Sequence, residues 1–310
     1  MLLYLPIAEL SVNIFLIFGM GAAVGFLSGL FGVGGGFLLT PLLVFSGIPP
    51  AVAVATVTSQ IVASSASGAL AYWRRKAIDW KLAGFLTAGG VVGTVLGVMA
   101  FRLLRAKGQL DLVIGVCYVV FLGGVGLLMV IESVRAMLRA RREEPPAPQK
   151  LRQHGWIHGL PFKVRFHRSR LYISALPILA LGVGIGFLGT LLGIGGGFLI
   201  VPALIYLLKV PTTVVIGTSL VQILATMAVA TVLQAAANHS VDAVLGLLLM
   251  VGGVIGAQFG AQVGTRLRGE QLRALLGLLI LAVGLRFAVD LVVTPQEPFS
   301  LWVTALEATP

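Results

Sequence analysis

The chain has 310 residues, of which 58% are hydrophobic and 11% are charged, and its formal net charge is +11. The polar residues are too few to cover the surface of a soluble globule of this length. The composition therefore excludes a soluble domain and favours an integral membrane protein. Ten of the 22 Lys and Arg residues lie in one segment, from Arg135 to Arg170, between two apolar halves. This distribution is typical of a cytoplasmic loop beside anionic lipid and argues against a nucleic-acid partner.

Apolar runs of about 20 residues, enough to cross the hydrocarbon core, recur in both halves of the chain. They cover residues 11–31, 51–73, 81–103 and 109–132, and then 172–192, 212–236, 242–264 and 271–293. Two shorter apolar pieces, 37–47 and 197–208, have about half the length of a span. The first run lacks a basic start and a cleavage site, so we expect a retained helix from Ser11 and not a signal peptide.

The two halves repeat one pattern, because the segment from Gly25 to Leu38 reappears from Gly186 to Leu199 with its three consecutive glycines. The repeat also pairs Thr56 and Gln60 with Thr218 and Gln222. We therefore predict an all-α polytopic membrane protein of two homologous repeats, each a glycine-broken helical hairpin plus three transmembrane helices. The first repeat covers 11–132, a basic cytoplasmic loop 133–171, the second repeat 172–293 and a C-terminal tail 294–310.

The distribution of Lys and Arg favours inverted repeats. Five elements per half place residues 74–76, the central loop and the basic turn at 266–273 in the cytoplasm, and only Arg102, Arg105 and Lys107 remain outside. Four elements per half would make the repeats parallel and leave one more basic cluster outside. We expect both termini outside, Arg141 inside, and a multi-pass protein of the cell inner (plasma) membrane.

A break of three glycines inside an apolar run is tolerated only where the backbone is buried in protein or lines a cavity. The amides that start the two short helices, from Gly35 to Phe37 and from Gly196 to Phe198, would attract an anion through the positive helix end. Thr and Gln side chains add neutral donors. The candidate substrate-binding residues are Gly34, Gly35, Gly36, Phe37, Thr56, Gln60, Gly195, Gly196, Gly197, Phe198, Thr218, Ser219 and Gln222. Tight helix crossing is the alternative role of the glycines, and hydroxyls often bond only their own helix.

Other polar residues have structural explanations. Asp79, Asp111 and Asp242 stand where a carboxylate caps a helix, and Arg286 and Asp290 have the spacing of an interfacial pair. His154 and His158 have a metal-pair spacing without a third ligand, so we expect neither a metal nor a cofactor. The glycines are not followed by the Lys-Ser/Thr of a nucleotide loop, and no span carries a nucleophile beside a base, so we do not expect an enzyme.

The paired Gly-Val-Gly-Gly-Gly-Phe and Gly-Ile-Gly-Gly-Gly-Phe segments, with Val215–Leu220, Asn238–Asp242 and Gly252–Gln258, resemble the TauE/SafE sulfite exporter family, also called the TSUP permeases. The resemblance covers about residues 11–293 and implies membrane transport of small anions, often sulfur-containing. The first repeat has Ala55-Thr56-Val57 where the second has Gly217-Thr218-Ser219. The two halves therefore need not contribute equally to the substrate site.

The broken repeats predict a transporter that works by alternating access around a midplane site between them. The resemblance implies that its substrate is a small anion, most often sulfite or an organosulfonate. Its expected partners are this small inorganic or organic sulfur anion and the lipid bilayer. The choice of coupling ion, H+ or Na+, and a homodimer are left open. The alternative hypothesis is a non-transporting assembly or sensor protein that uses the basic central loop.

Overall fold

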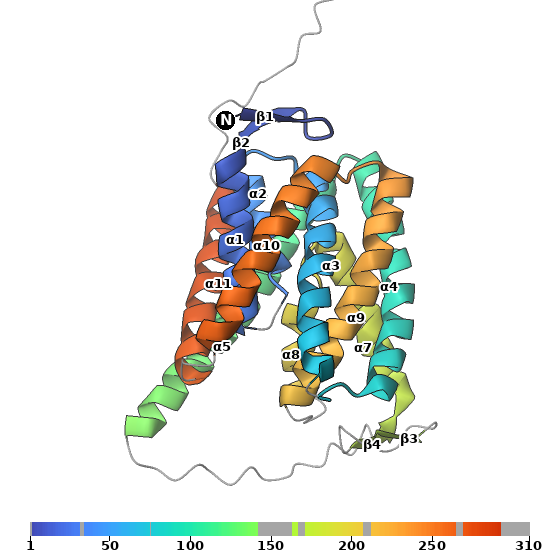
Figure 1. Cartoon of the computed structure of the whole chain (residues 1–310), viewed down its shortest axis with the longest axis vertical. Coiled ribbons are helices and arrows are strands. Elements are labelled where there is room, and N and C mark those ends of the chain that lie inside the picture. The colour runs from blue at the N-terminus through green and yellow to red at the C-terminus, as the bar shows by residue number, and fades with distance from the viewer. Residues whose placement is uncertain are drawn as a thin grey trace, which may run out of the picture.

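The computed structural model describes residues 2–31, 34–74, 76–141, 163–166, 171–206, 212–264 and 269–292. The first half contains α1 (Ile14–Phe31), α2 (Gly36–Phe45), α3 (Pro50–Arg74), α4 (Trp80–Ala106) and α5 (Leu110–Arg141). The second contains α7 (Ala175–Leu192), α8 (Gly197–Tyr206), α9 (Thr212–Leu233), the short π-helix η1 (Gln234–Asn238), α10 (Ala243–Gly264) and α11 (Gly269–Val292). The predicted all-α polytopic class is confirmed (Figure 1).

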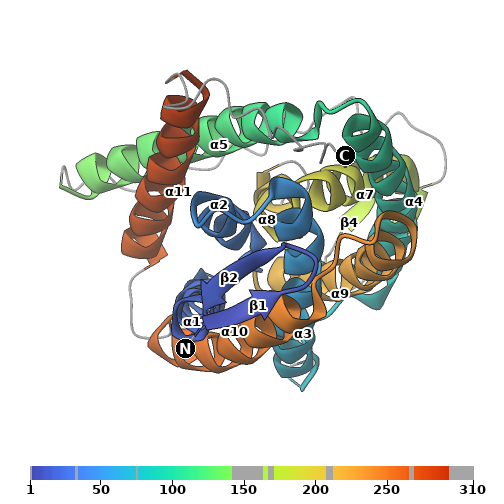
Figure 2. The ribbon, with the colours of Figure 1, turned by 90° about the horizontal axis from the view of Figure 1, so that it is seen from above.

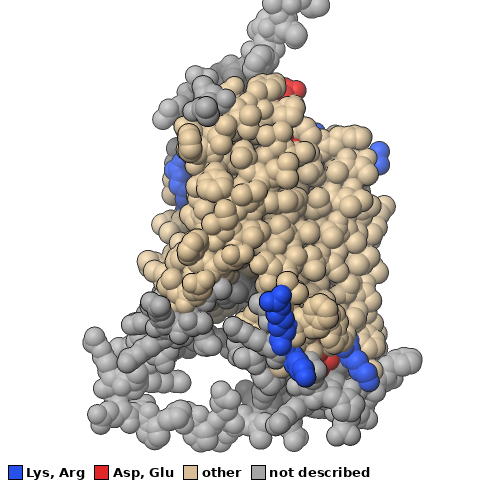
Figure 3. All heavy atoms as spheres, viewed as in Figure 1, with Lys and Arg blue, Asp and Glu red and all other residues tan. Residues whose placement is uncertain are grey.

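Within the described part of the chain, six helical segments are long and apolar enough to cross a membrane. They are Pro50–Arg74, Trp80–Ala106, Leu110–Ile131, Ala175–Leu192, Val214–Asn238 and Ala243–Gly260. Large hydrophobic side chains such as Met99, Leu128 and Phe259 are exposed on the outside of these helices, as lipid contact requires. In Figure 3 the visible face is almost entirely uncharged between its two ends.

Two antiparallel hairpins were not predicted. Strands β1 (Leu2–Leu5) and β2 (Leu10–Asn13) precede α1, and β3 (Lys163–Phe166) and β4 (Leu171–Ser174) precede α7. The expectation of a helix from Ser11 is therefore wrong by three residues, because Ser11 pairs with Tyr4 in the hairpin. Likewise, α5 continues to Arg141, so the segment 133–171 is not a loop throughout.

The duplication extends to the hairpins. With Gly25 aligned on Gly186, the starts of β1, β2, α1 and α2 correspond to those of β3, β4, α7 and α8. The start of α1 is capped by Asn13, whose Oδ1 accepts from the Phe15 amide (3.0 Å), and α7 starts with Ser174, whose Oγ accepts from the Leu176 amide (3.3 Å). Figure 1 shows α1 and β1–β2 beginning at one end of the molecule and α7 and β3–β4 at the other.

Helices pair across the halves through glycine. Helix α1 packs on α10, and α4 packs on α7 in the corresponding way. A Cβ placed on Gly25 would strike the carbonyl of Gly253, and one placed on Gly186 would strike that of Gly90. Since only hydrogen separates these backbones, the glycine spacings of α1, α4, α7 and α10 set the distance between the two halves.

The remaining contacts complete the bundle. Helix α3 packs on α9 and α5 on α11, and each of these pairs again joins the two halves. Seen from above, the short helices α2 and α8 lie inside the ring formed by the longer helices (Figure 2). Their side chains belong to the buried core, in which Phe37, Ile61, Leu192 and Phe198 are 2% exposed or less.

Candidate functional site

The two glycine breaks adopt backbone conformations that other residues rarely take. In the first, φ is +90° at Gly34 and +66° at Gly35, and in the second it is +78° at Gly195 and +74° at Gly196. These left-handed values explain the glycines, because a side chain would be strained there. The short helices α2 and α8 begin immediately after the breaks, as the sequence predicted.

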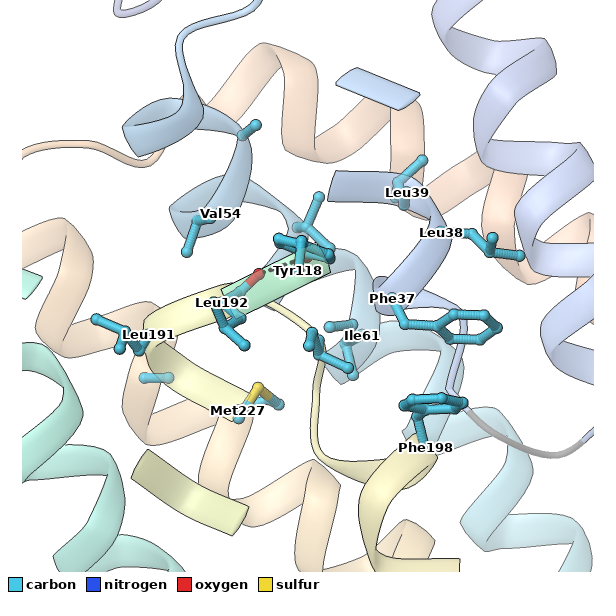
Figure 4. Close-up of a cluster of buried hydrophobic side chains, with 14 of the residues drawn as sticks. Phe37, Leu38, Leu39, Val54, Ile61, Tyr118, Leu191, Leu192, Phe198 and Met227 are labelled. Carbon is cyan, nitrogen blue, oxygen red and sulfur yellow. Dashed lines mark hydrogen bonds between the residues drawn. The ribbon is translucent and has the colours of Figure 1, made fainter. Parts of the chain in front are cut away.

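The two breaks meet in the interior of the molecule. The Phe37 and Phe198 rings, at the first turns of α2 and α8, stack with centroids 5.1 Å apart and planes at 16° (Figure 4). A Cβ on Gly36 would lie 2.7 Å from the Gly193 carbonyl and would collide with Ile61. The N-terminal ends of the two short helices therefore face one buried region, which joins residues about half the chain apart.

One of the expected backbone donors is engaged. The Gly36 amide donates to the Gly34 carbonyl (2.8 Å) and closes a tight turn at the break. The carbonyls of Gly35 and Gly196 accept from the first turns of α2 and α8, at Leu38 and Leu39 and at Leu199 and Ile200. The sequence predicted that the Gly36 amide is free to bind an anion, but in the structure this amide is engaged.

Two hydroxyls of the first half donate hydrogen bonds to backbone carbonyls at the second break. The Tyr118 hydroxyl donates to the Leu192 carbonyl (2.7 Å), and Thr40 Oγ1 donates to the Gly193 carbonyl (3.3 Å). These carbonyls end α7 and have no amide partner within that helix. Neither residue was predicted from the sequence, although a tyrosine inside the apolar run of α5 signals a buried hydroxyl that needs an acceptor. The corresponding positions of the second half, Val201 and Ile280, cannot donate.

Thr56 and Thr218 do not meet at the breaks. The Asp242 amide donates to Thr56 Oγ1 (3.0 Å), and the Asp79 amide donates to Thr218 Oγ1 (3.1 Å). Helices α10 and α4 start at opposite ends of the molecule (Figure 1), so the two threonines accept these hydrogen bonds towards opposite ends of the bundle. Ser219 donates to the Ile216 carbonyl of its own helix (3.0 Å).

Gln60 and Gln222 are the unusual members of the predicted set. Gln60 is fully buried and Gln222 is 1% exposed, yet within the described residues both polar atoms of the Gln60 amide and Oε1 of Gln222 have no hydrogen-bond partner. Each amide lies against a glycine of the other half: a Cβ on Gly253 would be 2.5 Å from Gln60 Nε2, and one on Gly90 would be 2.9 Å from Gln222 Nε2. Unpaired buried amides are costly, which marks them as groups available to a ligand.

Several structural interpretations hold. Asp79 Oδ1 accepts from the Leu82 amide (3.2 Å), and Asp242 Oδ1 accepts from those of Val244 (3.1 Å) and Leu245 (3.0 Å), so both cap helices. Arg286 pairs with Asp290 (3.1 Å) on an exposed face. Asp111 lies in the first turn of α5.

Arg105 has a structural role, because it donates to the Asn238 carbonyl (2.8 Å) and to Ser240 Oγ (2.6 Å) at the end of η1. Across the described residues, three or more His, Cys, Asp or Glu nowhere gather as a metal site. His154, His158, Arg266, Arg268 and the tail 294–310 lie outside the described residues.

An apolar helical bundle with two broken helices whose N-termini meet in its interior defines a polytopic membrane protein of the transporter class. The model of the sulfite exporter TauE/SafE family matches residues 17–287, and the chain belongs to this family of membrane transporters.

Full-length relatives support the assignment. The chain is 30% identical over 277 residues to Probable membrane transporter protein YjnA of Bacillus subtilis. The match covers 89% of the chain and 99% of that protein. It is 32% identical over 271 residues to a Probable membrane transporter protein of Xylella fastidiosa, covering 86% and 92%. A shorter match, 30% over 122 residues, covers 37% of the chain and 26% of Sulfite exporter TauE/SafE family protein 3 of Arabidopsis thaliana. No solved structure matches the chain.

Proposed function

We propose that the protein transports a small sulfur-containing anion, sulfite or an organosulfonate, which binds between the two glycine breaks. The observation that carries the proposal is the meeting of two helix N-termini, at Gly36 and Gly197, beside the stacked Phe37 and Phe198 rings. Each helix start bears a partial positive charge, and two such ends repel each other in an apolar interior unless an anion lies between them.

The two buried glutamine amides extend this site. The Gln60 amide is unpaired, and the Gln222 NH2 group keeps one N–H besides the one that faces Thr226 Oγ1 (3.4 Å). Each can therefore donate to an anion without the cost of burying an arginine. The names of the Arabidopsis relatives, which state sulfite export, agree with a sulfur oxyanion as substrate. In this proposal Gly34–Phe37, Gly195–Phe198, Gln60 and Gln222 contact the anion. Thr56, Thr218 and Ser219, predicted as ligands, instead hold the surrounding backbone.

Alternating access requires two halves that rock against each other around a fixed site. The reciprocal pairing of α1 with α10 and of α4 with α7, and the opposite starting ends of the halves, favour inverted repeats. The repeats would comprise residues 11–132 and 172–293, with the basic segment between them at the cytoplasmic face of the plasma membrane.

The test is anion flux through purified protein in liposomes. We expect saturable flux of sulfite or an organosulfonate, inhibited by the other, and little flux of the chemically different cation choline. A folded, reconstituted protein that moves none of sulfite, sulfate, thiosulfate and organosulfonates would contradict the proposal and favour the alternative of a sensor or assembly protein.

A further inference from the structure

A buried serine lies against the first glycine break. A Cβ placed on Gly35 would be 3.0 Å from Ser28 Cβ and 3.4 Å from Ser28 Oγ. Gly35 is the N-cap residue of α2, and it has no side chain that could accept from the amides of the first turn. Ser28 is 7% exposed, and its hydroxyl makes no hydrogen bond within the described residues. A free hydroxyl therefore lies next to the start of α2.

A second serine with a free hydroxyl lies on α3. Ser65 is fully buried, and its Oγ has no hydrogen-bond partner in the described part of the chain. By contrast, the neighbouring Ser64 donates to the Ile61 carbonyl of its own helix (3.1 Å). A Cβ on Gly36 or on Gly195 would strike the Ile61 side chain. Because Ser65 follows Ile61 by four residues, it lies on the same face of α3, one turn from the breaks.

The repeat brings the two serines together. Ser28 corresponds to Gly189 in the two glycine segments. Ser65 corresponds to Met227, in the aligned sequences Gln-Ile-Val-Ala-Ser-Ser and Gln-Ile-Leu-Ala-Thr-Met. In the second half, a Cβ on Gly189 would lie 3.2 Å from the Gly196 amide nitrogen and 3.4 Å from Met227 Cε. By this correspondence, the Ser28 and Ser65 side chains meet beside the first break.

The surroundings of the two breaks correspond in other respects as well. A Cβ on Gly35 would lie 3.2 Å from Val24 Cγ1. Ile185 corresponds to Val24, and its Cγ2 would lie 2.5 Å from a Cβ on Gly196. The difference between the breaks is chemical. The second half fills the space beside its break with the Met227 thioether, whereas the first half has two short side chains whose hydroxyls are free among the described residues.

We propose that Ser28 and Ser65 are further substrate-binding residues, which donate hydrogen bonds to the oxygen atoms of the transported anion at the first break. This inference rests on the proposed function above and names two more ligands for its anion. Hydroxyls donate to an oxyanion without carrying a charge of their own. The first break needs such donors, because its Gly36 amide is engaged by the Gly34 carbonyl (2.8 Å). The oxygen atoms of the anion are therefore bound unequally by the two halves.

The test is titration of sulfite against the purified full-length protein in detergent, together with the melting temperature of the unliganded protein. Ser28→Ala and Ser65→Ala keep the space and remove only the hydroxyl, so each should weaken sulfite binding about tenfold. Neither should lower the unliganded melting temperature, because no hydrogen bond is lost. Ser59→Ala is the matched control on α3. Its hydroxyl donates to the Thr56 carbonyl (2.6 Å), so this variant should bind sulfite as the wild type does.

A second variant tests the comparison of the two breaks. Ser28→Gly combined with Ser65→Met copies into the first half the pair that the second half contains at Gly189 and Met227. This double variant should fold, because the second half packs the same pair beside its own break. It should lose sulfite binding, since both hydroxyls are gone and the thioether fills the space.

An unchanged sulfite affinity in the folded double variant Ser28→Ala, Ser65→Ala would overturn the serine site and leave the proposed transport function standing. Losses of affinity that Ser59→Ala shares, or that accompany an equal loss of unliganded stability, would also overturn it, because they indicate a structural role. A wild-type protein that binds none of sulfite, sulfate, thiosulfate and organosulfonates would instead contradict the proposed function, and this inference with it.

Discussion

At the scale of single residues, the buried hydrogen-bonding groups divide into engaged and free ones. Tyr118 and Thr40 are engaged, since they satisfy carbonyls at the end of α7. The amides of Gln60 and Gln222 remain wholly or partly free although both residues are buried. Substitution of an engaged group should cost stability, and substitution of a free group should cost ligand binding instead.

Tyr118→Phe keeps the ring that stacks on Phe287 with centroids 5.1 Å apart but removes the hydrogen bond to Leu192 O. The carbonyl is then buried without its partner, so we expect a loss of about 1 to 3 kcal/mol in stability. The melting temperature of the purified variant checks this. Tyr4→Phe is the control, because Tyr4 is 60% exposed, and an equal loss in both variants would contradict the role given to Tyr118.

Gln222→Leu should separate binding from folding. Removal of a partly unpaired amide should leave stability unchanged or raise it, whereas the loss of a ligand donor should weaken anion binding by about 1 to 3 kcal/mol, roughly tenfold or more. Titration of sulfite against the purified protein measures the affinity. Ser67→Ala on α3 should bind as the wild type does. An unchanged sulfite affinity in the folded Gln222→Leu variant would show that Gln222 does not bind the anion.

The glycine breaks show why one substitution cannot report on binding alone. Gly35 has a φ of +66°, and an added Cβ would lie 3.0 Å from Ser28 Cβ and 3.2 Å from Val24 Cγ1. The methyl group of Gly35→Ala would therefore press on α1, as that of Gly196→Ala would press on Ile185. We expect both variants to lose transport and folded protein together, and transport per folded molecule is the quantity to compare.

At the scale of elements, the pairs of helices depend on backbone contact. Gly186→Ala places a methyl group on the Gly90 carbonyl and should drive α4 and α7 apart. Gly184→Ala, two residues away on the same helix, meets no atom within 4 Å and should be neutral or slightly stabilising, because alanine favours the helix by about 0.5 to 1 kcal/mol. The measurement is the fraction of each variant that is monodisperse after extraction from the membrane into detergent. Equal behaviour would contradict the packing described.

Local sequence patterns predicted the long helices, the two half-length helices and the aspartate caps, because each depends on residues within a few positions of one another. The hairpins before α1 and α7 were missed, since strands of four residues carry little periodic signal. The cross-half bonds of Thr56 and Thr218 were also missed. Their partners lie 186 and 139 residues away, and no local pattern records such pairs.

At the scale of the whole molecule, the hairpin at the N-terminus lies at one end of the bundle and binds the other half. The Ile7 amide donates to Asp242 Oδ2 (3.0 Å), and Leu5 is fully buried. The same aspartate caps α10 and adjoins Thr56 through its amide. The first hairpin thus reinforces the contact between the halves at its own end of the bundle.

The inverted arrangement makes a topological prediction. The hairpin residues 2–13 should lie outside the cell and Arg141 inside, because this placement leaves the fewest basic residues outside. Single cysteines at Glu9 and Arg141, in a chain with Cys117 replaced by alanine, should react with impermeant maleimide only from the outside and only from the inside, respectively. Labelling of both from the same side would exclude this topology.

The central claim is that one anion lies between the helix starts at Gly36 and Gly197. A crystal structure with a bromine-labelled alkanesulfonate would test it most directly, since anomalous scattering locates the bromine and the density around it locates the sulfonate. We expect a sulfonate beside Phe37 and Phe198, within hydrogen-bond distance of the amides at the two breaks or of Gln60 or Gln222. A sulfonate bound elsewhere, for example at Arg105 beside η1, with the breaks unoccupied at saturating ligand, would contradict it.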